Sequence, residues 1–267
     1  MKIVVFDLDE TLGYFTEFGI FWDCIVDYLK IKNKDDNKLT QEDFNEILDL
    51  FPEFLRPNII NILIFLKEQK KRNCCHKMMI YTNNNGPQEW AHKIIKYFEN
   101  KINFKLIDQV IAAFKINGQT VEICRTTHKK TRKDFIRCTK IPSNAEICFL
   151  DDTFYPEMAN DHIYYINVKP YYYDLEFDYM IKKFKESQIG KKIINNDNNF
   201  DKEFREKLKL YKYDNIIKDI KEYEIDKVLG KHIITHLQEF FYKSKKHKTA
   251  RNKIKRNFKH NQTYKKN

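Results

Sequence analysis

The chain has 267 residues, of which 42% are hydrophobic and 33% are charged, with six Gly and six Pro. This length suits one substantial core with an appendage, and the composition favours a helix-rich soluble protein. The apolar runs fall short of the roughly 20 residues that a membrane-spanning helix needs. The first apolar run ends in acids and does not resemble a signal peptide. We therefore expect a cytoplasmic or nuclear protein that is not secreted and contacts no membrane.

The net charge of +11 comes from the end of the chain. Residues 243–267 hold eleven Lys or Arg and no acid, which leaves 38 basic and 38 acidic residues in residues 1–242. A basic segment of this kind binds anionic partners such as nucleic acid, serves as a nuclear address, or is a solvated end. We expect this tail to be disordered, and nucleic acid is a candidate partner for it.

Six cysteines are scattered without a CxxC pair. In a chain that is not secreted, such cysteines are typically free rather than bonded in disulfides or to zinc. We therefore expect free, buried or half-buried thiols at Cys24, Cys74, Cys75, Cys124, Cys138 and Cys148.

In chain order, the first element is a short β-branched and aromatic run from Ile3 to Phe6, which predicts a buried strand. Two carboxylates, Asp7 and Asp9, follow it directly. Carboxylates at the end of a buried strand are costly unless a cation or a ligand compensates their charge. Because chemistry in a parallel sheet gathers beyond the carboxyl ends of the strands, these residues mark a candidate phosphate-and-metal site.

Residues 13–50 predict a small helical insert. The apolar spacing of residues 21–29 is helical, and a second helix is expected to begin at Thr40 with an acid three residues on, a capping pattern. The aromatic side chains of the insert either cover the site as a small cap or pack between helices; they are Phe18, Phe21 and Trp22.

Strands and helices alternate after the insert. A helix is expected after Pro57, another from Pro87 to residue 98, and others after the basic stretch 127–137 and up to about residue 184. The predicted later strands are residues 78–81, 106–114, 146–150 and 163–168, with a further short strand at 121–124 after an Asn117-Gly118 turn. This alternation implies a parallel sheet flanked by helices, a Rossmann-like α/β fold.

Further polar groups follow the predicted strands. Thr82 and Asn83 end the second strand, and Asp151-Asp152 end a later one. Transfer of a phosphoryl group to a carboxylate needs a nucleophile, an acid for the leaving oxygen, and donors and cations for the phosphate. Thr82 offers a hydroxyl, and the loop from Asn83 offers backbone N–H groups to a phosphate oxygen.

The same pattern assigns the acidic residues. Asp7 is placed as nucleophile, and Asp9 as general acid and then as base for the attacking water. Mg²⁺ prefers hard carboxylate oxygens together with phosphate and water. We expect it to be held by Asp7, the backbone carbonyl of Asp9, and Asp151 and Asp152.

These motifs occur in an order that resembles the haloacid dehalogenase superfamily of aspartate-nucleophile phosphatases. The resemblance rests on DLDETL (residues 7–12), an apolar strand ending in Thr82, Lys133-Asp134 at a helix start, and FLDD (residues 149–152). It spans residues 1 to about 184. It implies Mg²⁺ and an aspartyl-phosphate intermediate, and it implies Thr82 and Lys133 as phosphate ligands.

One branch of the superfamily is most similar, the NLI-interacting-factor-like phosphatases that act on phosphoserine in the tail of RNA polymerase II. DLDETL, Leu55-Arg56-Pro57 before a helix, and Lys133-Asp134 carry this similarity. The chain departs from the branch at Asp152, where Asn is usual, and in its helical insert, which is largely β in the branch.

The lysine has alternatives close by. Lys129, Lys130 and Lys133 all lie within reach of the phosphate position. We favour Lys133 because the residues after it begin an apolar helix, and Lys130 is the second choice.

On this interpretation, residues 1–187 form the phosphatase-like domain with the insert at 13–50, residues 188–242 form a helical extension, and residues 243–267 form the tail. A phosphoprotein (phosphoserine or phosphothreonine) is the favoured substrate, since a small insert leaves the site open. Two alternatives remain: a phosphatase of nucleotides or polynucleotide ends, and a catalytically idle scaffold that binds nucleic acid or an acidic partner through its tail. The scaffold is favoured if Asp7 lies outside metal range of Asp151 or Asp152.

Overall fold

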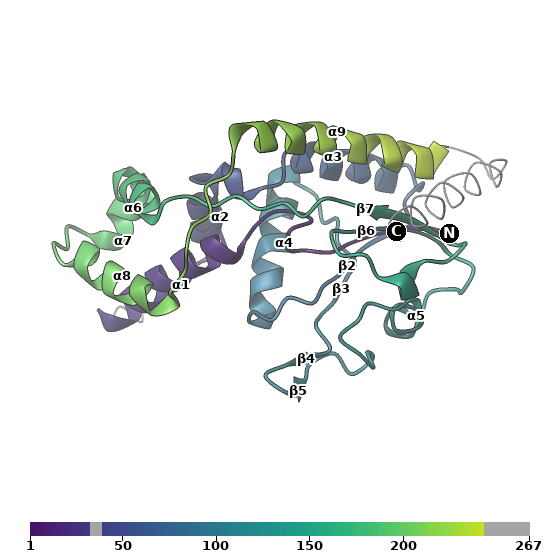
Figure 1. Cartoon of the computed structure of the whole chain (residues 1–267), viewed down its shortest axis with the longest axis horizontal. Coiled ribbons are helices and arrows are strands. Elements are labelled where there is room, and N and C mark those ends of the chain that lie inside the picture. The colour runs from purple at the N-terminus through teal and green to yellow at the C-terminus, as the bar shows by residue number, and fades with distance from the viewer. Residues whose placement is uncertain (33–38, 243–267) are drawn as a thin grey trace, which may run out of the picture.

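A computed structural model of the chain describes residues 1–32 and 39–242. Five parallel strands form one sheet in the spatial order β3-β2-β1-β6-β7, with β1 at its centre. Figure 1 labels β2, β3, β6 and β7 of this sheet. The α/β class predicted from the sequence is therefore confirmed. The strands are β1 (Lys2–Phe6), β2 (Lys77–Tyr81), β3 (Gln109–Ile111), β6 (Glu146–Asp151) and β7 (Ile163–Asn167).

The helices form two groups. Those that cover the sheet are α3 (Ile59–Lys71), α4 (Gln88–Ile102), α5 (Arg132–Thr139) and α9 (Ile220–Tyr242). Those that pack together beyond the sheet, here called the helical lobe, are α1 (Thr16–Ile31), α2 (Gln41–Asp49), α6 (Phe177–Glu186), α7 (Gln188–Ile194) and α8 (Phe200–Leu208). Short 3₁₀ helices lie at η1 (Pro52–Phe54), η2 (Pro156–Met158) and η3 (Lys209–Tyr211).

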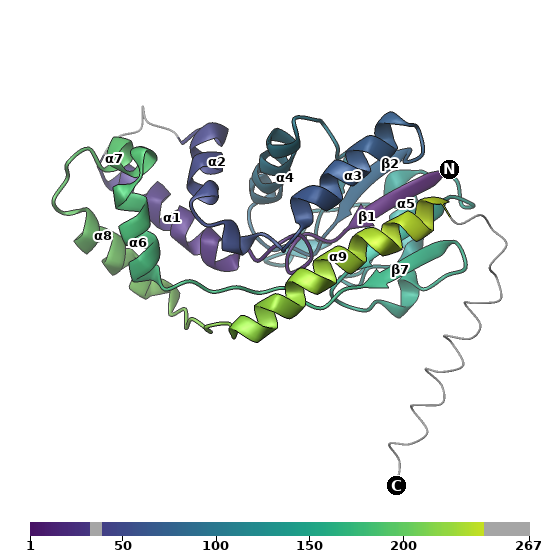
Figure 2. The same cartoon turned by 90° about the horizontal axis from the view of Figure 1, so that it is seen from above.

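Both faces of the sheet are covered, which explains why its central strands are apolar at consecutive positions. Val4 and Phe6 of β1 pack in one hydrophobic cluster with α3, α4 and α9. Ile3 and Val5 point the other way, into a second cluster with Phe135 of α5. Figure 2 shows α9 alongside α3 over the first face.

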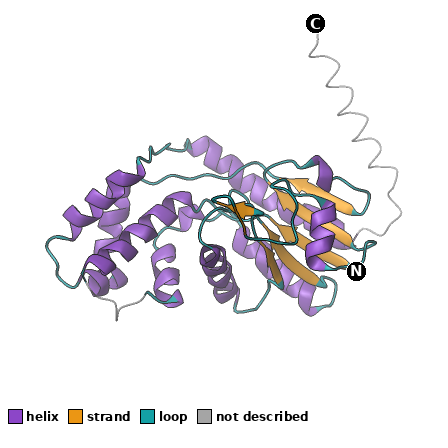
Figure 3. Cartoon of the chain, turned by 90° about the horizontal axis from the view of Figure 1, so that it is seen from below, coloured by secondary structure: helices purple, strands orange, loops and turns teal. Residues whose placement is uncertain are grey.

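The helical lobe joins the predicted insert to segments from much later in the chain. Phe21 of α1 contacts the rings of Phe51, Phe184 and Phe204 at centroid distances of 5.5, 5.7 and 5.1 Å. Figure 3 shows these helices gathered at the end of the molecule away from the strands. Helices on both sides of the predicted boundary at residues 187–188 therefore lie in the same lobe, and α9 alone returns to the sheet.

Local sequence signals explain several element ends. Thr40 begins α2 with a capping box to Asp43, as predicted. The predicted Asn117-Gly118 turn has positive φ at both residues and joins β4 (Lys115–Ile116) to β5 (Gln119–Thr120). The strand predicted at 106–114 covers only β3, which is an edge strand paired to β2 alone. The strand predicted at 121–124 is wrong, because the hairpin is closed by earlier residues and 121–124 form a loop.

The prediction that all six cysteines are free is wrong for two of them. Cys124 and Cys138 form a disulfide, because α5 folds back along the loop before it and brings their Cα atoms to 5.0 Å. The remaining cysteines are free, with Cys74 exposed and the others buried.

None of the described helices is both long and apolar enough to cross a membrane. The predicted basic tail at residues 243–267 lies outside the described residues.

Candidate functional site

The predicted acidic residues meet at the carboxyl ends of β1 and β6. These strands are neighbours in register, with Phe6 opposite Leu150, so Asp7 and Asp151 leave the sheet side by side. The carboxylate oxygens of Asp7, Asp151 and Asp152 lie within 4.8 Å of one another. Three of the four predicted metal ligands therefore form one side-chain group.

Asp9, the fourth predicted ligand, was expected to contribute its backbone carbonyl. Its side chain is not part of the group of three carboxylates, and its Oδ2 accepts a hydrogen bond from Asn84 Nδ2 at 2.7 Å. Thr11 joins the two acidic segments, because its hydroxyl donates to Asp152 Oδ1 at 2.9 Å and accepts from the Asp152 N–H at 3.2 Å. The loop after β1 is thus fixed to the loop after β6.

The lysine in this group is Lys130. Its Nζ lies 2.7 Å from Asp7 Oδ1 and 2.7 Å from Asp151 Oδ2, and the residue is 1% exposed. Lys133, the favoured choice from the sequence, is exposed to solvent and is not brought to the carboxylates. Lys129 is also exposed, with its Nζ 3.9 Å from Glu157.

Thr82 and Asn83 lie at the end of β2, as expected. The Thr82 hydroxyl accepts the Asn84 N–H at 3.0 Å and retains its own hydrogen to donate. The Asn83 side chain is held on both sides, because it accepts from Arg125 at 2.8 Å and donates to the Tyr155 hydroxyl at 3.1 Å. The side chain of Asn83 therefore has a structural role, and its backbone N–H is the group that suits a phosphate.

Two buried arginines, which the sequence did not assign to the site, support it. Arg56 donates to the backbone carbonyls of Glu10, Thr11 and Lys169. It thereby holds Glu10 at a φ of 56°, a conformation that non-glycine residues rarely adopt. Arg125 holds the loop after β2. Leu55-Arg56-Pro57 was one of the motifs behind the family resemblance, whereas Arg125 stands in no recognisable pattern.

Burial controls the electrostatics of the group. It raises the pKa of Asp7, although the Lys130 charge opposes this, and it raises the pKa of Asp151 to about 7 and that of Asp9 to about 6. Burial alone would lower the pKa of Lys130, but the charges of Asp7 and Asp151 outweigh it and raise that pKa. The lysine therefore stays charged among carboxylates that are costly to ionise.

The donor set fits a hard divalent cation. Carboxylate oxygens are what Mg²⁺ prefers, and when ionised the group formed by Asp7, Asp151, Asp152 and Lys130 has a net charge of −2. A cation among these oxygens would offset the burial that raises the pKa values of Asp7 and Asp151.

No protein-family model, no curated protein and no solved structure matches this chain. The motifs and the geometry of the site are therefore the grounds for assigning a function.

Proposed function

We propose that this chain is a Mg²⁺-dependent phosphatase of the haloacid dehalogenase type, with Asp7 as nucleophile. The observation that carries the proposal is the buried Lys130, whose Nζ lies 2.7 Å from both Asp7 and Asp151 beside the further carboxylate of Asp152. A buried lysine among clustered acids contributes little to folding stability on balance, and such arrangements concentrate at active sites.

In the proposed reaction, a carboxylate oxygen of Asp7 attacks the phosphorus, and the bond from phosphorus to the leaving oxygen breaks. Asp9 gives the leaving oxygen its proton. The ionised Asp9 then takes a proton from the water that hydrolyses the aspartyl-phosphate, and Asp7 is restored. Asn84 supports this role because its hydrogen bond to Asp9 Oδ2 fixes the orientation of that carboxylate.

Groups around Asp7 balance the charge of the phosphate. Lys130 supplies a fixed positive charge, and Thr82 and the backbone N–H of Asn83 supply hydrogen-bond donors. Mg²⁺, when bound by Asp7, Asp151 and Asp152, would polarise the phosphate and neutralise its negative charge. The same ion would reduce repulsion between the substrate and the acids of the site.

A phosphoprotein is the substrate class that we favour. The aromatic side chains that had the potential to cap the site are buried, since Phe18 contacts Phe44 of α2 and Trp90 of α4, and Trp22 contacts Phe44. They pack between helices as buried side chains and do not form an exposed cap, which supports access for a large substrate. The basic tail favours polynucleotide ends as the alternative substrate, and it also suits a nuclear or cytoplasmic location.

The first test is hydrolysis of an aryl phosphate with and without Mg²⁺. The wild type should turn over with Mg²⁺, and Asp7→Asn should lose at least about a thousandfold in kcat because the nucleophile is removed. Asp214→Asn is the matched control, since Asp214 is an exposed carboxylate that is not among the proposed site residues. Equal turnover by Asp7→Asn and wild type would rule out Asp7 as the nucleophile.

The second test separates the substrate classes. Purified wild type is compared on a phosphoserine peptide and on an oligonucleotide with a terminal phosphate, under the same salt and Mg²⁺. A higher kcat/KM for the peptide supports the phosphoprotein assignment, and a higher value for the oligonucleotide supports the alternative. A folded chain that binds Mg²⁺ and hydrolyses neither would favour the idle scaffold.

A further inference from the structure

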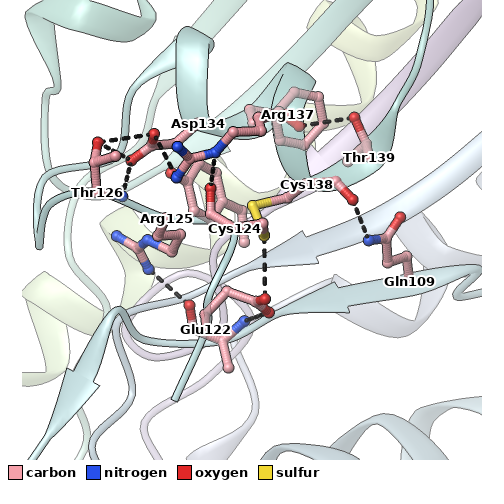
Figure 4. The surroundings of a disulfide bond; sticks show 12 residues. Gln109, Glu122, Cys124, Arg125, Thr126, Asp134, Arg137, Cys138 and Thr139 are labelled. Atoms are coloured by element: carbon pink, nitrogen blue, oxygen red, sulfur yellow. Dashed lines mark hydrogen bonds and ion pairs between the residues drawn. A yellow bond between two sulfur atoms is a disulfide. The ribbon is translucent and has the colours of Figure 1, made fainter. Parts of the chain in front are cut away.

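The disulfide between Cys124 and Cys138, shown with its surroundings in Figure 4, closes a ring of chain. Cys124 lies in the loop after the β4–β5 hairpin, and Cys138 lies in the last turn of α5. The chain between them carries two buried cations, Arg125 and Lys130. Because Lys130 contacts Asp7, the conformation of this ring bears directly on the site.

Arg125 connects the ring to the loop after β2. It follows Cys124 directly and donates to the carbonyl oxygens of Thr82 at 3.0 Å and Ala112 at 2.8 Å. It also donates to Oδ1 of Asn83 at 2.8 Å. A displacement of Cys124 would therefore move the guanidinium that holds the proposed phosphate-binding residues.

Hydrogen bonds hold the two ends of the ring in addition to the disulfide. Cys138 is fixed within α5, and its carbonyl accepts from Gln109 Nε2 at 3.0 Å. Near Cys124, the carboxylate of Asp134 accepts from the Thr126 N–H at 2.8 Å. These bonds do not depend on the disulfide, so its loss should loosen the ring without unfolding it.

The surroundings of the pair also suit the reduced state. Both cysteines are partly exposed, so a small thiol can reach them. Oε1 of Glu122 lies 3.1 Å from Cys124 Sγ, where it can accept the hydrogen of a free thiol. Cys74 is free and exposed, which is typical of a chain in a reducing compartment, where disulfides are usually transient.

We propose that Cys124 and Cys138 are a reversible redox pair whose disulfide holds Arg125 and Lys130 in the arrangement that the site needs. Reduction uses two molecules of a small thiol such as glutathione. The first attacks one cysteine sulfur and breaks the S–S bond, which gives a mixed disulfide and a free cysteine. The second attacks the small thiol's sulfur and releases the small disulfide, so two electrons and two protons pass to the cysteine pair. The small disulfide drives the reverse reaction.

The expected effect of the disulfide on hydrolysis rests on the proposed phosphatase function. Its expected effect on the conformation of the ring does not. The full chain is equilibrated at a series of ratios of reduced to oxidised glutathione. Free thiols are then trapped by alkylation and located by mass spectrometry, and aryl phosphate hydrolysis is measured on the same samples. The disulfide fraction and kcat/KM should rise together, with the oxidised protein about tenfold more active, because small displacements of positioning groups slow catalysis.

Three variants sharpen this experiment. Cys124→Ser and Cys138→Ser should both stay at the reduced level of activity at every glutathione ratio. Cys74→Ser should respond as the wild type does, since Cys74 lies in the turn between α3 and β2 and is not part of the ring. A response that persists in Cys124→Ser would overturn the proposal.

Amide hydrogen exchange separates failure of this inference from failure of the proposed function. The oxidised wild type should protect residues 124–131 and the loop at 82–84 more than the reduced form, whether or not the protein hydrolyses phosphate. Protection without hydrolysis in either state would reject the phosphatase and retain the redox coupling. Hydrolysis and exchange that are both independent of redox state would reject the coupling and retain the phosphatase.

Besides a small disulfide, a metal ion is a reactant that suits the reduced cysteines. The ligand atoms of Glu122, Cys124 and Cys138 lie within 4.8 Å of one another, and thiolates with a carboxylate can bind Zn²⁺. Reduced protein is therefore titrated with Zn²⁺ alone. Uptake of one Zn²⁺ per chain that blocks reoxidation would identify a metal site and overturn the redox pair; reoxidation in the presence of Zn²⁺ would support the pair.

Discussion

The choice of lysine at the candidate site is decided by one helix cap. The Thr131 hydroxyl accepts the Asp134 N–H at 3.0 Å, so α5 begins at Arg132. Lys130 precedes the cap and turns in toward the sheet, whereas Lys133 lies on the exposed side of the first turn. The sequence favours Lys133 because its apolar pattern locates the helix but not the residue that caps it.

Replacement of each lysine by methionine tests this assignment. Lys130→Met should lower kcat for aryl phosphate hydrolysis by about a hundredfold, because it removes a fixed charge beside the attacking carboxylate. Lys133→Met should change kcat by less than about twofold, since an exposed side chain that contacts no reacting group contributes little. Steady-state kinetics at saturating Mg²⁺ measures both effects.

Thermal unfolding of both variants shows whether the loss is catalytic. Lys130→Met leaves Asp7 and Asp151 without their cation, so its stability also falls, and kinetics must be measured well below its Tm. A large loss in Lys133→Met together with a small one in Lys130→Met would reverse the assignment.

The supporting arginines show what a sequence cannot reveal about this site. Arg56 and Arg125 act mainly on backbone carbonyls, which every residue has, so their partners leave no signature in the sequence. The carboxylates differ from the arginines, because Asp7 and Asp151 stand at the ends of strands that the apolar pattern of the sequence identifies. Three of the four predicted acidic side chains therefore lie together as expected, while the residues that hold their loops in place were not predicted.

At the scale of elements, a cap and a turn that neighbouring residues decide were predicted correctly, whereas two features that depend on distant contacts were not. The Thr40 cap and the Asn117-Gly118 turn were predicted correctly, since each is decided by neighbouring residues. The extent of β3 depends on its position at the edge of the sheet, and the Cys124–Cys138 pair depends on how α5 folds back. Neither of those could be known before the fold.

The docking of α9 on the sheet depends on a close backbone contact. Gly230 lies against the segment before α3, where a Cβ at this position would be 2.2 Å from the carbonyl oxygen of Pro57. The Gly230 carbonyl also accepts from Asn58 Nδ2 at 3.2 Å. A side chain here would collide with backbone atoms that cannot move independently of α3.

Gly230→Ala should therefore destabilise the protein. Alanine raises helix propensity by about 1 kcal/mol over glycine, but overpacking against backbone costs about 1–3 kcal/mol, so we expect a net loss of up to about 2 kcal/mol. Urea unfolding followed by circular dichroism measures the change. Lys231→Ala, on the exposed side of the same helix, should stay within about 0.5 kcal/mol of wild type. A more stable Gly230→Ala would mean that α9 does not approach Pro57 so closely.

At the scale of the whole molecule, two segments that connect the sheet to the helical lobe both donate hydrogen bonds to Glu17. The segment that leads from β7 to α6 donates the Leu175 N–H to Glu17 Oε2 at 2.7 Å. The segment that leads from α8 back to α9 donates the side-chain amide of Asn215 to Glu17 Oε1. Asp174 reinforces this junction, accepting from the Tyr213 hydroxyl at 2.6 Å. A single buried carboxylate at the start of α1 thus binds both connecting segments.

The protonation of Glu17 should make the stability of the fold depend on pH. Burial raises the pKa of Glu17 from 4.5 to about 8, and the charge of Asp174 adds to this. Between these values the folded chain binds a proton that the unfolded chain has released, so this contribution to stability is full below pH 4.5 and is lost as the pH rises to about 8. The slope from one such group is about 1.4 kcal/mol per pH unit.

Other groups titrate in the same range, so the free energy of unfolding is measured from pH 5 to pH 8 for wild type and for Glu17→Gln, which cannot ionise. The difference between the two should change in favour of Glu17→Gln as the pH rises, and a difference that is constant with pH would show that Glu17 is ionised in the folded chain throughout.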